Sequence, residues 1–362
     1  MRRGIPPGST VIIKVGSSSL TTTEGEVGDG VARAVAAVDV ARRQGYPTVL
    51  VSSGAVAAGL PALGLSTRPH DVVELQVAAA VGQGRLMERY AATFGDIGVT
   101  TGQVLLTMEV LSNRGQYLNA RAALTRMLAA GIVPIVNEND TVVVEELRLG
   151  DNDRLAAIVS HLVGAGLLLI LTDTEGLFSA DPRLGEAELL SAVRHADDLL
   201  DRLSGVGPLG SGGVATKVAA ARMAAWSGVP TVVAAATADR VVERVLAGDE
   251  VGTWVDPRAQ RLPARKLWIA FGQAAAGVVV IDDGAVRALV DQARSLLPVG
   301  VIGVEGSFPP GAAVEVHDRH QQLVAKGIVR IDSATLGQAK GQRSALEAIH
   351  RDDLVVLRPS SQ

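Results

Sequence analysis

The chain contains no cysteine among its 362 residues. This absence excludes disulfide bonds, thiolate catalysis and cysteine-ligated zinc, and it favours a reducing compartment. The six histidines show no spacing that is typical of zinc ligands. A formal net charge of −4 at pH 7 argues against a protein whose main task is non-specific binding of nucleic acid.

Long apolar runs are missing as well. The strongest apolar run, Leu167–Leu171, is far too short to span a bilayer and is typical of a buried strand. Arg2 and Arg3 precede a segment that holds two prolines and no apolar stretch, so we expect no signal peptide. We therefore expect a cytoplasmic protein without a membrane segment.

Three common motifs of nucleotide sites and hydrolases are absent or fail. No Gly-Lys-Ser/Thr follows a glycine at the spacing of a Walker A motif. Residues 205–210 match G-x-G-x-x-G, but they follow a helical pattern and include a proline, so we reject a Rossmann dinucleotide site. Leu50 stands where the G-x-S-x-G motif of serine hydrolases requires its first glycine.

The composition is that of a globular protein with a sizeable core, with 48% hydrophobic and 20% charged residues, and the length predicts two domains. From Thr10 to about Glu250, short apolar runs alternate with helical patterns. We expect strands at 11–15, 48–51, 99–106, 132–136, 167–171 and 231–235, a hairpin arm at 142–149, and helices at 29–44, 70–94, 115–130, 151–163, 213–227 and 239–247. This alternation predicts an α/β fold, a three-layer αβα sandwich around a mostly parallel sheet.

The pattern changes after Asp249. Short β-rich runs separated by glycines follow, at 277–281, 299–304, 313–316, 323–331 and 354–357, with one helix at 283–295. These runs predict a small, mainly β domain. We place the two domains at residues 1–255 and 256–362, with the core of the second at about 265–358.

Polar residues follow the strands expected at 11–15, 48–51, 132–136 and 167–171. In open parallel sheets, ligands bind beyond the carboxyl ends of the strands. Lys14 interrupts the first strand, and because burying an unpaired ammonium group is costly, we expect it to face an anion. The loop Gly16–Ser19 has small side chains and free backbone N–H groups, which suit a phosphate.

Two other strand-end clusters have an ordinary explanation beside a functional one. The residues 52–54, Ser-Ser-Gly, form either a simple turn or a backbone site for a carboxylate or phosphate. The residues 137–140, Asn-Glu-Asn-Asp, form either a solvated turn or a carboxylate partner for a substrate ammonium group.

Two helix starts also carry more polar groups than a helix needs. Capping of the helix N-terminus accounts for Asp151. It does not account for Asn152 and Asp153, two further polar residues at the positive end of the helix dipole. Residues 210–217 form a glycine-rich turn that leads into a helix, and helix N-termini bind phosphates. The helix dipole disfavours a lysine such as Lys217 in the first turn, unless an anion binds there. The alternative interpretation of residues 210–217 is a plain loop without a ligand.

Taken together and in this order, these motifs resemble the amino acid kinase family, and within it the branch that phosphorylates free glutamate. The resemblance rests on residues 13–17, 51–59, 134–140, 150–153, 171–177, 180–182 and 212–217. It covers essentially the whole chain, because the part from Leu262 onward resembles the PUA domain that is appended to many bacterial members of this branch. It implies the amino acid kinase fold followed by a small, mainly β PUA domain.

The resemblance also implies roles for individual residues. Lys14, Lys217 and Asp153 are the implied catalytic residues, with Asp153 orienting the two lysines. The implied ATP site consists of Lys14, Gly16, Thr172, Asp173, Ser211, Gly212, Gly213, Val214, Ala215, Thr216 and Lys217. The implied glutamate site consists of Ser53, Gly54, Asn137, Asp140 and Asn152. No residue is assigned as a metal ligand.

The implied reaction is the ATP-dependent phosphorylation of the γ-carboxylate of L-glutamate to L-glutamyl 5-phosphate, the first step of proline biosynthesis. The resemblance implies Mg²⁺ as a cofactor, L-proline as a feedback inhibitor and a homo-oligomer, either a dimer or a tetramer. Another acceptor, N-acetylglutamate or aspartate, is an alternative. Asp140 argues against N-acetylglutamate, because a blocked amine does not need a carboxylate partner.

PUA domains elsewhere often bind RNA, which makes an RNA-binding protein with a sensor kinase-like half a further alternative. From Leu262 to Gln362 there are eleven Lys and Arg against ten Asp and Glu, and only three aromatic residues: Trp268, Phe271 and Phe308. RNA binding normally requires a basic excess or a stacking surface. We therefore favour a structural or regulatory role for this domain.

Overall fold

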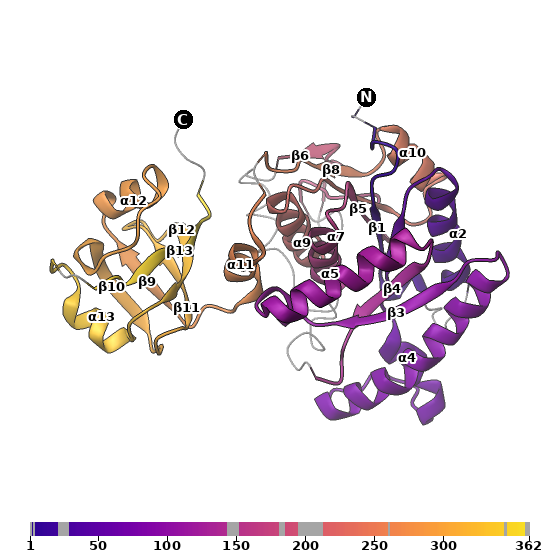
Figure 1. Cartoon of the computed structure of the whole chain (residues 1–362), viewed down its shortest axis with the longest axis horizontal. Helices are drawn as coiled ribbons and strands as arrows, with labels where there is room; N and C mark the ends of the chain where they lie inside the picture. The colour runs from indigo at the N-terminus through magenta and orange to yellow at the C-terminus, as the bar shows by residue number, and fades with distance from the viewer. Residues whose placement is uncertain are drawn as a thin grey trace. The chain divides into compact units, whose positions relative to one another are not determined.

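A computed structural model describes residues 2, 4–20, 29–142, 152–180, 185–194, 213–259, 261–343 and 346–358 (Figure 1). The chain divides into two compact units, Met1–Arg261 and Leu262–Gln362. The boundary that we place between residues 255 and 256 stays a prediction. Among the described residues, no helix combines the length and the apolar character needed to cross a bilayer.

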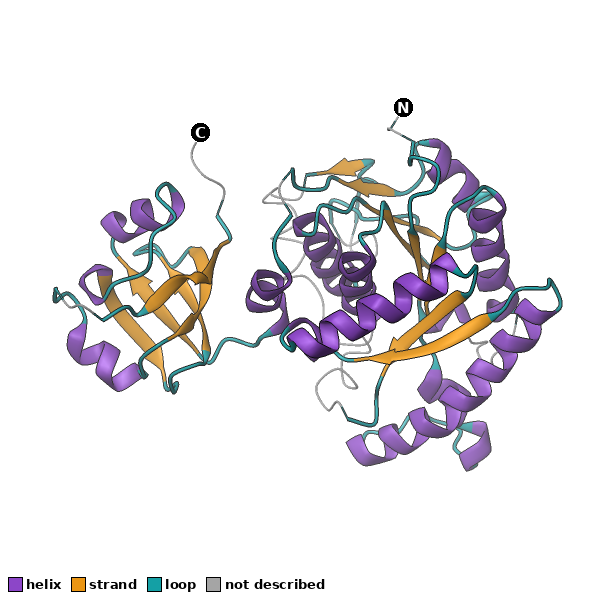
Figure 2. Cartoon of the chain, viewed as in Figure 1, coloured by secondary structure: helices purple, strands orange, loops and turns teal. Residues whose placement is uncertain are grey.

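The first unit is built on one large sheet of eight strands (Figure 2). In spatial order these are β3 (Thr101–Leu106), β4 (Val133–Glu138), β2 (Thr48–Val51), β1 (Val11–Val15), β5 (Leu167–Thr172), β7 (Thr231–Ala235), β8 (Thr253–Val255) and β6 (Ala192–Val193). Neighbouring strands run parallel except β7 and β8, which are antiparallel. The predicted, mostly parallel sheet is confirmed.

Helices cover both faces of this sheet (Figure 1). One layer holds α2 (Gly30–Arg43), α4 (Val72–Gly95) and α10 (Val241–Ala247), and the other holds α5 (Arg114–Ala129), α7 (Asn152–Val163) and α9 (Val214–Trp226). Short helical segments follow the strand ends: α1 (Ser17–Leu20), α3 (Ala55–Gly59), η1 (Pro61–Leu63) and η2 (Met108–Leu111). The predicted three-layer αβα sandwich is confirmed.

The central strands are buried on both faces, as parallel strands between two helical layers must be. All residues of β1 and β5 are buried, and their side chains are apolar except at Lys14 and Thr172. Lys14 pairs in register with Val51 on one side and Ile170 on the other. This lysine therefore lies in the middle of the core sheet, where its ammonium group requires a charged partner.

A close crossing of two glycines sets the position of α4. A Cβ atom on Gly82 of α4 would lie 1.8 Å from the carbonyl oxygen of Ala55, and one on Gly59 of α3 would lie 2.0 Å from that of Ala78. Neither position has room for a side chain, so the backbones of α3 and α4 are in direct contact. Because α3 follows β2 directly, the crossing holds α4 against the strand-end edge of the sheet.

The second unit contains a five-stranded sheet in the order β10 (Val301–Gly306), β9 (Gly277–Ile281), β11 (Ala313–His317), β12 (Leu323–Val329) and β13 (Ile349–Val356). Its helical segments are α11 (Ala264–Leu267), the π-helical turn η3 (Trp268–Gly272), α12 (Asp283–Val290), η4 (Pro298–Gly300) and α13 (Ser333–Ala339). The mainly β character is confirmed. Its core is apolar and includes Ile281, Val316 and Leu354.

The differences from the sequence-based elements are local. The strands β6 and β8 and the helices α3, α11 and α13 were not predicted, because segments of two to seven residues are too short to show periodicity. The loop expected at Gly16–Ser19 is wrong in part, because the short helix α1 begins at Ser17. The helix expected at 283–295 ends at Val290, and the strand expected at 354–357 begins earlier, at Ile349. The hairpin arm expected at 142–149 falls, beyond Val142, outside the described residues.

Candidate active site

Four neighbouring parallel strands bring polar residues to one edge of the large sheet. These strands are β4, β2, β1 and β5, and they end next to Asn137, Ser53, Lys14 and Thr172. Two helices begin with further polar residues: α7 with Asn152 and Asp153, and α9 with Thr216 and Lys217 in its first turn.

The centre of this edge is a buried group of three charges, which we call the lysine–aspartate triad: Lys14, Asp153 and Lys217. The Lys14 Nζ lies 2.6 Å from Oδ1 of Asp153, and the Lys217 Nζ lies 3.4 Å from Oδ2 of the same carboxylate. The hydroxyl group of Thr216 also lies 3.0 Å from Oδ2. Asp153 is only 1% exposed, and both lysines are buried.

The electrostatics of the triad favour an ionised aspartate. Burial by itself raises the pKa of Asp153, but the charges of Lys14 and Lys217 and the hydrogen bonds from Lys14 and Thr216 outweigh it and hold the pKa below its usual value. Within the triad itself, two ammonium groups face one carboxylate. Buried ammonium groups attract an anion more strongly than exposed ones do.

A cluster of amide and hydroxyl groups lies beside the triad, and we call it the amide cluster: Ser52, Ser53, Asn137 and Asn152. The Nδ2 atom of Asn152 lies 3.0 Å from the carbonyl oxygen of Ser52, 3.0 Å from Ser53 Oγ and 2.9 Å from Asn137 Oδ1. The other amide atom of Asn152, Oδ1, is buried and has no hydrogen-bond partner among the described residues. Buried acceptors are rarely left unpaired in native proteins, so this oxygen is suited to a ligand that donates hydrogen bonds.

Asp140 lies just beyond β4, in a half-buried position. Burial raises the pKa of Asp140 to about 6, although the charge of Arg68 opposes the shift. At neutral pH this carboxylate is therefore ionised, and it would gain from a cationic partner.

Two glycines lie at the strand ends, and the backbone conformation requires glycine at one of them, Gly54. Gly16 follows β1, and a Cβ atom there would lie 3.5 Å from the Lys14 Nζ, so its absence leaves space beside the ammonium group. Gly54 caps α3 with a left-handed φ of 94°, a conformation that side chains other than glycine rarely adopt.

The remaining residues of the implied ATP site lie at the end of β5 and the start of α9. The hydroxyl group of Thr172 donates to Asp173 Oδ1 at 3.0 Å. Gly213 and Val214 are exposed and Ala215 is half-buried. Ser211 and Gly212 lie outside the described residues, as do Gly150 and Asp151.

The structure thus joins the predicted residues in two contact groups. One group contains Lys14, Asp153, Thr216 and Lys217, and the other contains Ser53, Asn137 and Asn152. Asp140, Thr172 and Asp173 lie at the same sheet edge, and Thr172 and Asp173 are hydrogen-bonded to each other.

Sequence reasoning missed two residues of α4. Tyr90 OH lies 2.9 Å from Ser52 Oγ, and Asn137 Nδ2 donates to Gln83 Oε1 at 2.7 Å. Tyr90 follows the apolar pattern of α4 and gives no signal. Gln83 gives none by itself, although its neighbour Gly82 does, because a glycine inside a helical pattern often has a packing reason.

Comparisons with known proteins agree with this geometry. The model of the amino acid kinase family matches residues 9–235, and the model of the PUA domain matches residues 277–351. A solved carbamate kinase from Giardia lamblia bound to AMP-PNP superposes with a TM-score of 0.52 at 16% identity, covering 69% of this chain and 99% of that one, and so shares the fold. The chain belongs to the amino acid kinase family.

The similarity extends over the full length for one branch of that family. A glutamate 5-kinase from Marinomonas sp. is 45% identical, and one from Frankia casuarinae is 46% identical. Each comparison covers 99% of this chain and 100% of the relative. Within the family, the chain therefore groups with the glutamate 5-kinases, and the resemblance drawn from the motifs is confirmed.

Proposed function

We propose that the chain transfers the γ-phosphoryl group of ATP to the side-chain carboxylate of L-glutamate. The products are L-glutamyl 5-phosphate and ADP, and the reaction is the first step of proline biosynthesis. The observation that carries the proposal is the lysine–aspartate triad, in which two buried ammonium groups meet at one carboxylate, directly beside the amide cluster. The names of the full-length relatives support the same reaction.

The chemistry explains why the site needs lysines rather than a general base. The acceptor carboxylate of glutamate is already ionised near pH 7. The obstacle is the approach of this anion to a polyanionic phosphate, so catalysis rests on positioning and on neutralising charge. Lys14 and Lys217 approach Asp153 from two different elements, β1 and α9, and can brace a phosphoryl group between them. Asp153 holds both ammonium groups in place.

The implied cofactor Mg²⁺ would bind at this edge together with ATP. Both oxygens of Asp153 are already engaged by lysine and threonine. The described part of the chain holds no group of three acidic or histidine side chains able to bind a metal. When bound, Mg²⁺ supplies further neutralisation of phosphate charge.

We assign the amide cluster and Asp140 to glutamate. The free Oδ1 of Asn152 and the carboxylate of Asp140 are acceptors for the α-ammonium group. The hydroxyl group of Ser53 and the backbone N–H of Gly54 are donors for the α-carboxylate. An acetylated amine carries no positive charge for Asp140 to pair with, which favours free glutamate over N-acetylglutamate.

We assign the nucleotide to the other side of the triad. Gly16 leaves room for phosphate oxygens beside Lys14, and the N-terminus of α9 supplies backbone N–H groups and the positive end of its dipole. The ATP site also includes Thr172, Asp173 and the segment from Ser211 to Lys217. Gly213, Val214 and Ala215 contribute through the backbone.

Several finer expectations accompany this proposal. The cytoplasmic location, inhibition by L-proline and a dimer or tetramer stay predictions. So does the structural or regulatory role of the PUA domain, with RNA binding as the alternative that we do not favour. A filter-binding assay with tRNA at low salt tests this last point.

Capture of the acyl phosphate tests the reaction. The protein is incubated with ATP, Mg²⁺, hydroxylamine and one acceptor, and the hydroxamate product is measured. We expect product with L-glutamate and none above background with N-acetylglutamate or L-aspartate. Equal product from either of these acceptors, or none from L-glutamate, would overturn the proposal.

A further inference from the structure

We propose that Gln83 is a positioning residue for glutamate. Its side-chain carbonyl accepts a hydrogen bond from Asn137 and so holds this amide in the orientation that the Glu138 N–H selects, in which Asn137 also accepts from Asn152. Asn152 presents an oxygen that has no hydrogen-bond partner among the described residues. The inference rests on the proposed function, because it assigns the amide cluster to glutamate. Gln83 belongs to α4, far in sequence from the motifs at the strand ends.

The orientation of Asn137 follows from a backbone donor. The backbone N–H of Glu138 donates to Asn137 Oδ1 at 2.9 Å. A backbone N–H cannot act as an acceptor, so the oxygen of the Asn137 amide must lie on this side. The Nδ2 atom of Asn137 therefore faces Gln83, and Gln83 must present its oxygen, which lies 2.7 Å away.

The orientation of Asn152 follows from a backbone acceptor. Its Nδ2 atom lies 3.0 Å from the carbonyl oxygen of Ser52, a group that cannot donate. The same Nδ2 atom lies 2.9 Å from Asn137 Oδ1, whose position the Glu138 N–H has already fixed. The three amides therefore form a chain in which Asn152 donates to Asn137 and Asn137 donates to Gln83. Asn152 Oδ1 lies at the start of this amide chain and has no hydrogen-bond partner among the described residues.

The fold holds Gln83 in place at the other end of this chain. Gly82, the residue before Gln83, makes the close crossing with α3, where a Cβ atom would lie 1.8 Å from the carbonyl oxygen of Ala55. Further along α4, Tyr90 is tied to Ser52 at the end of β2 by a buried hydrogen bond of 2.9 Å. The backbone of α4 is therefore anchored on both sides of Gln83.

Loss of the Gln83 carbonyl would disturb the cluster in one of two ways. Asn137 is 2% exposed, so its Nδ2 atom would either stay buried without this acceptor or turn away. Rotation of the amide would set Nδ2 against the Glu138 N–H and against Asn152 Nδ2, both of which are donors. Either outcome weakens the binding of glutamate and leaves the lysine–aspartate triad untouched.

The test compares Gln83→Met, which removes the acceptor, with Gln83→Glu, which keeps an acceptor at the same reach. Gln116→Met, at an exposed position of α5, is the matched control. We expect Gln83→Met to raise the KM for glutamate about tenfold, the effect of one weakened buried hydrogen bond. We expect kcat and the KM for ATP to stay within about twofold, and Gln83→Glu to recover most of the loss.

A second comparison tests the direction of the amide chain. Asn137→Asp replaces the donor that faces Gln83 with an acceptor, which Gln83 can meet by turning its own amide. The double variant Asn137→Asp, Gln83→Glu sets two carboxylates against each other. We expect Gln83→Glu to be well tolerated in the wild-type chain and to raise the KM for glutamate at least about tenfold further in the Asn137→Asp background.

The outcomes separate this inference from the proposed function. An active wild type whose KM for glutamate is unchanged by Gln83→Met overturns the positioning role alone. The positioning role is also overturned if Gln83→Met raises the KM for glutamate and the KM for ATP equally. It is overturned too if Gln83→Met and Gln83→Glu have equal effects. Both results indicate a structural role. A wild type that makes no hydroxamate from L-glutamate overturns both proposals. If Gln83→Met is insoluble, Gln83→Asn, which withdraws the carbonyl by one methylene group, takes its place.

Discussion

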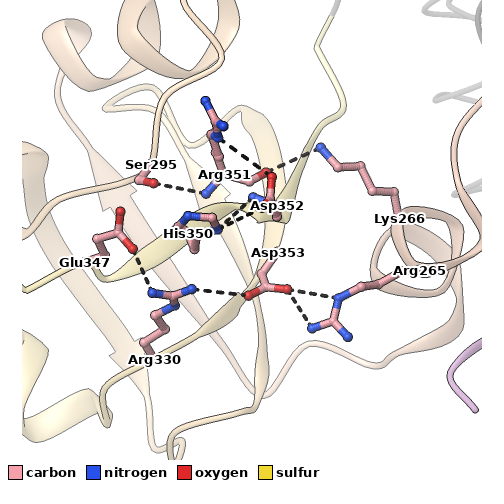
Figure 3. Close-up of polar contacts among 9 residues, drawn as sticks. All are labelled: Arg265, Lys266, Ser295, Arg330, Glu347, His350, Arg351, Asp352 and Asp353. Carbon is pink, nitrogen blue, oxygen red and sulfur yellow. Dashed lines mark hydrogen bonds and ion pairs between the residues drawn. The ribbon is translucent and has the colours of Figure 1, made fainter.

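Each unit of the chain holds a group of ion pairs with similar distances and very different surroundings. In the first unit, the triad has distances of 2.6 and 3.4 Å and side chains that are at most 10% exposed. In the second unit, Asp353 lies 2.6 Å from Arg265, and Arg330 lies 2.8 Å from Glu347 (Figure 3). These arginine side chains are 62% and 49% exposed.

The comparison teaches that burial and the charges of the partners determine the energetic effect of an ion pair more than its distance does. Exposed ion pairs are screened by water and contribute about 0–1 kcal/mol, whereas removing one partner of a buried pair costs about 3–5 kcal/mol. In the surface group of Figure 3, the ion pairs of Arg265 and Arg330 with Asp353 and Glu347 set two arginines against two carboxylates. In the triad, two buried lysines meet at one carboxylate, which supports the proposal that an anion binds there.

The largest effect is expected from breaking the triad at its centre. Asp153→Asn leaves two buried ammonium groups without their carboxylate, so the first unit should lose about 3–5 kcal/mol of stability along with its activity. Thermal unfolding, followed by circular dichroism with and without phosphate, measures the loss. Phosphate should stabilise this variant more than the wild type, and an unchanged melting temperature would contradict the role of the triad in the fold.

The next effect separates catalysis from stability. Lys217→Ala leaves Asp153 paired with Lys14, so the fold should be kept. The loss of one preorganised charge should lower kcat about a hundredfold to a thousandfold, which corresponds to about 2.7–4 kcal/mol. Steady-state kinetics measure it, with Lys340→Ala in the second unit as control. An unchanged kcat would remove Lys217 from the mechanism.

A smaller effect concerns pH and Asp140. Because the pKa of Asp140 is raised to about 6, kcat/KM for glutamate should fall about tenfold per pH unit below that value, as the carboxylate loses its charge. The folded state binds this proton more tightly than the unfolded state, so stability declines as the pH rises from about 4 to 6. Asp140→Asn should therefore raise both the KM for glutamate and the melting temperature at pH 7. A wild-type profile that is flat between pH 5 and 7 would exclude this carboxylate as the ammonium partner.

The smallest effect is expected in the surface group. Asp353→Asn should change the stability of the second unit by less than about 1 kcal/mol and leave kinase activity unaltered. In 1 M salt the difference from the wild type should vanish, because the Debye length falls to about 3 Å. The effect of Asp153→Asn should persist in the same salt. A large, salt-resistant loss for Asp353→Asn would remove the contrast between the two groups.

The sequence allowed the sheet and its edge to be predicted, because strongly apolar runs such as Val11–Val15 and Leu167–Leu171 admit few alternatives. Lys14 was expected to face an anion, because a lone ammonium group within such an apolar run needs a charged partner. The structure places Asp153 between Lys14 and Lys217, where the family resemblance implied it, and its catalytic role stays a prediction.

The parts that could not be predicted depend on contacts between distant segments. The helix α3 has five small residues and no periodicity, and its crossing with α4 depends on two glycines, Gly59 and Gly82, that are remote in sequence. Gln83 was missed because its bond to Asn137 joins a helix to a strand end 54 residues away. Only the packed structure brings these groups together.

The start of α7 has a consequence for the distance between the two substrates. Asn152 belongs to the amide cluster and Asp153 to the triad, and they are consecutive residues of one helix. In the proposed mechanism, the residue that contacts the acceptor and the residue that holds the two lysines are thus joined by a single peptide bond, with Cα atoms about 3.8 Å apart. Any shift of α7 carries both residues together, so the amide cluster and the triad are linked by covalent geometry that thermal motion of the surrounding helices cannot stretch.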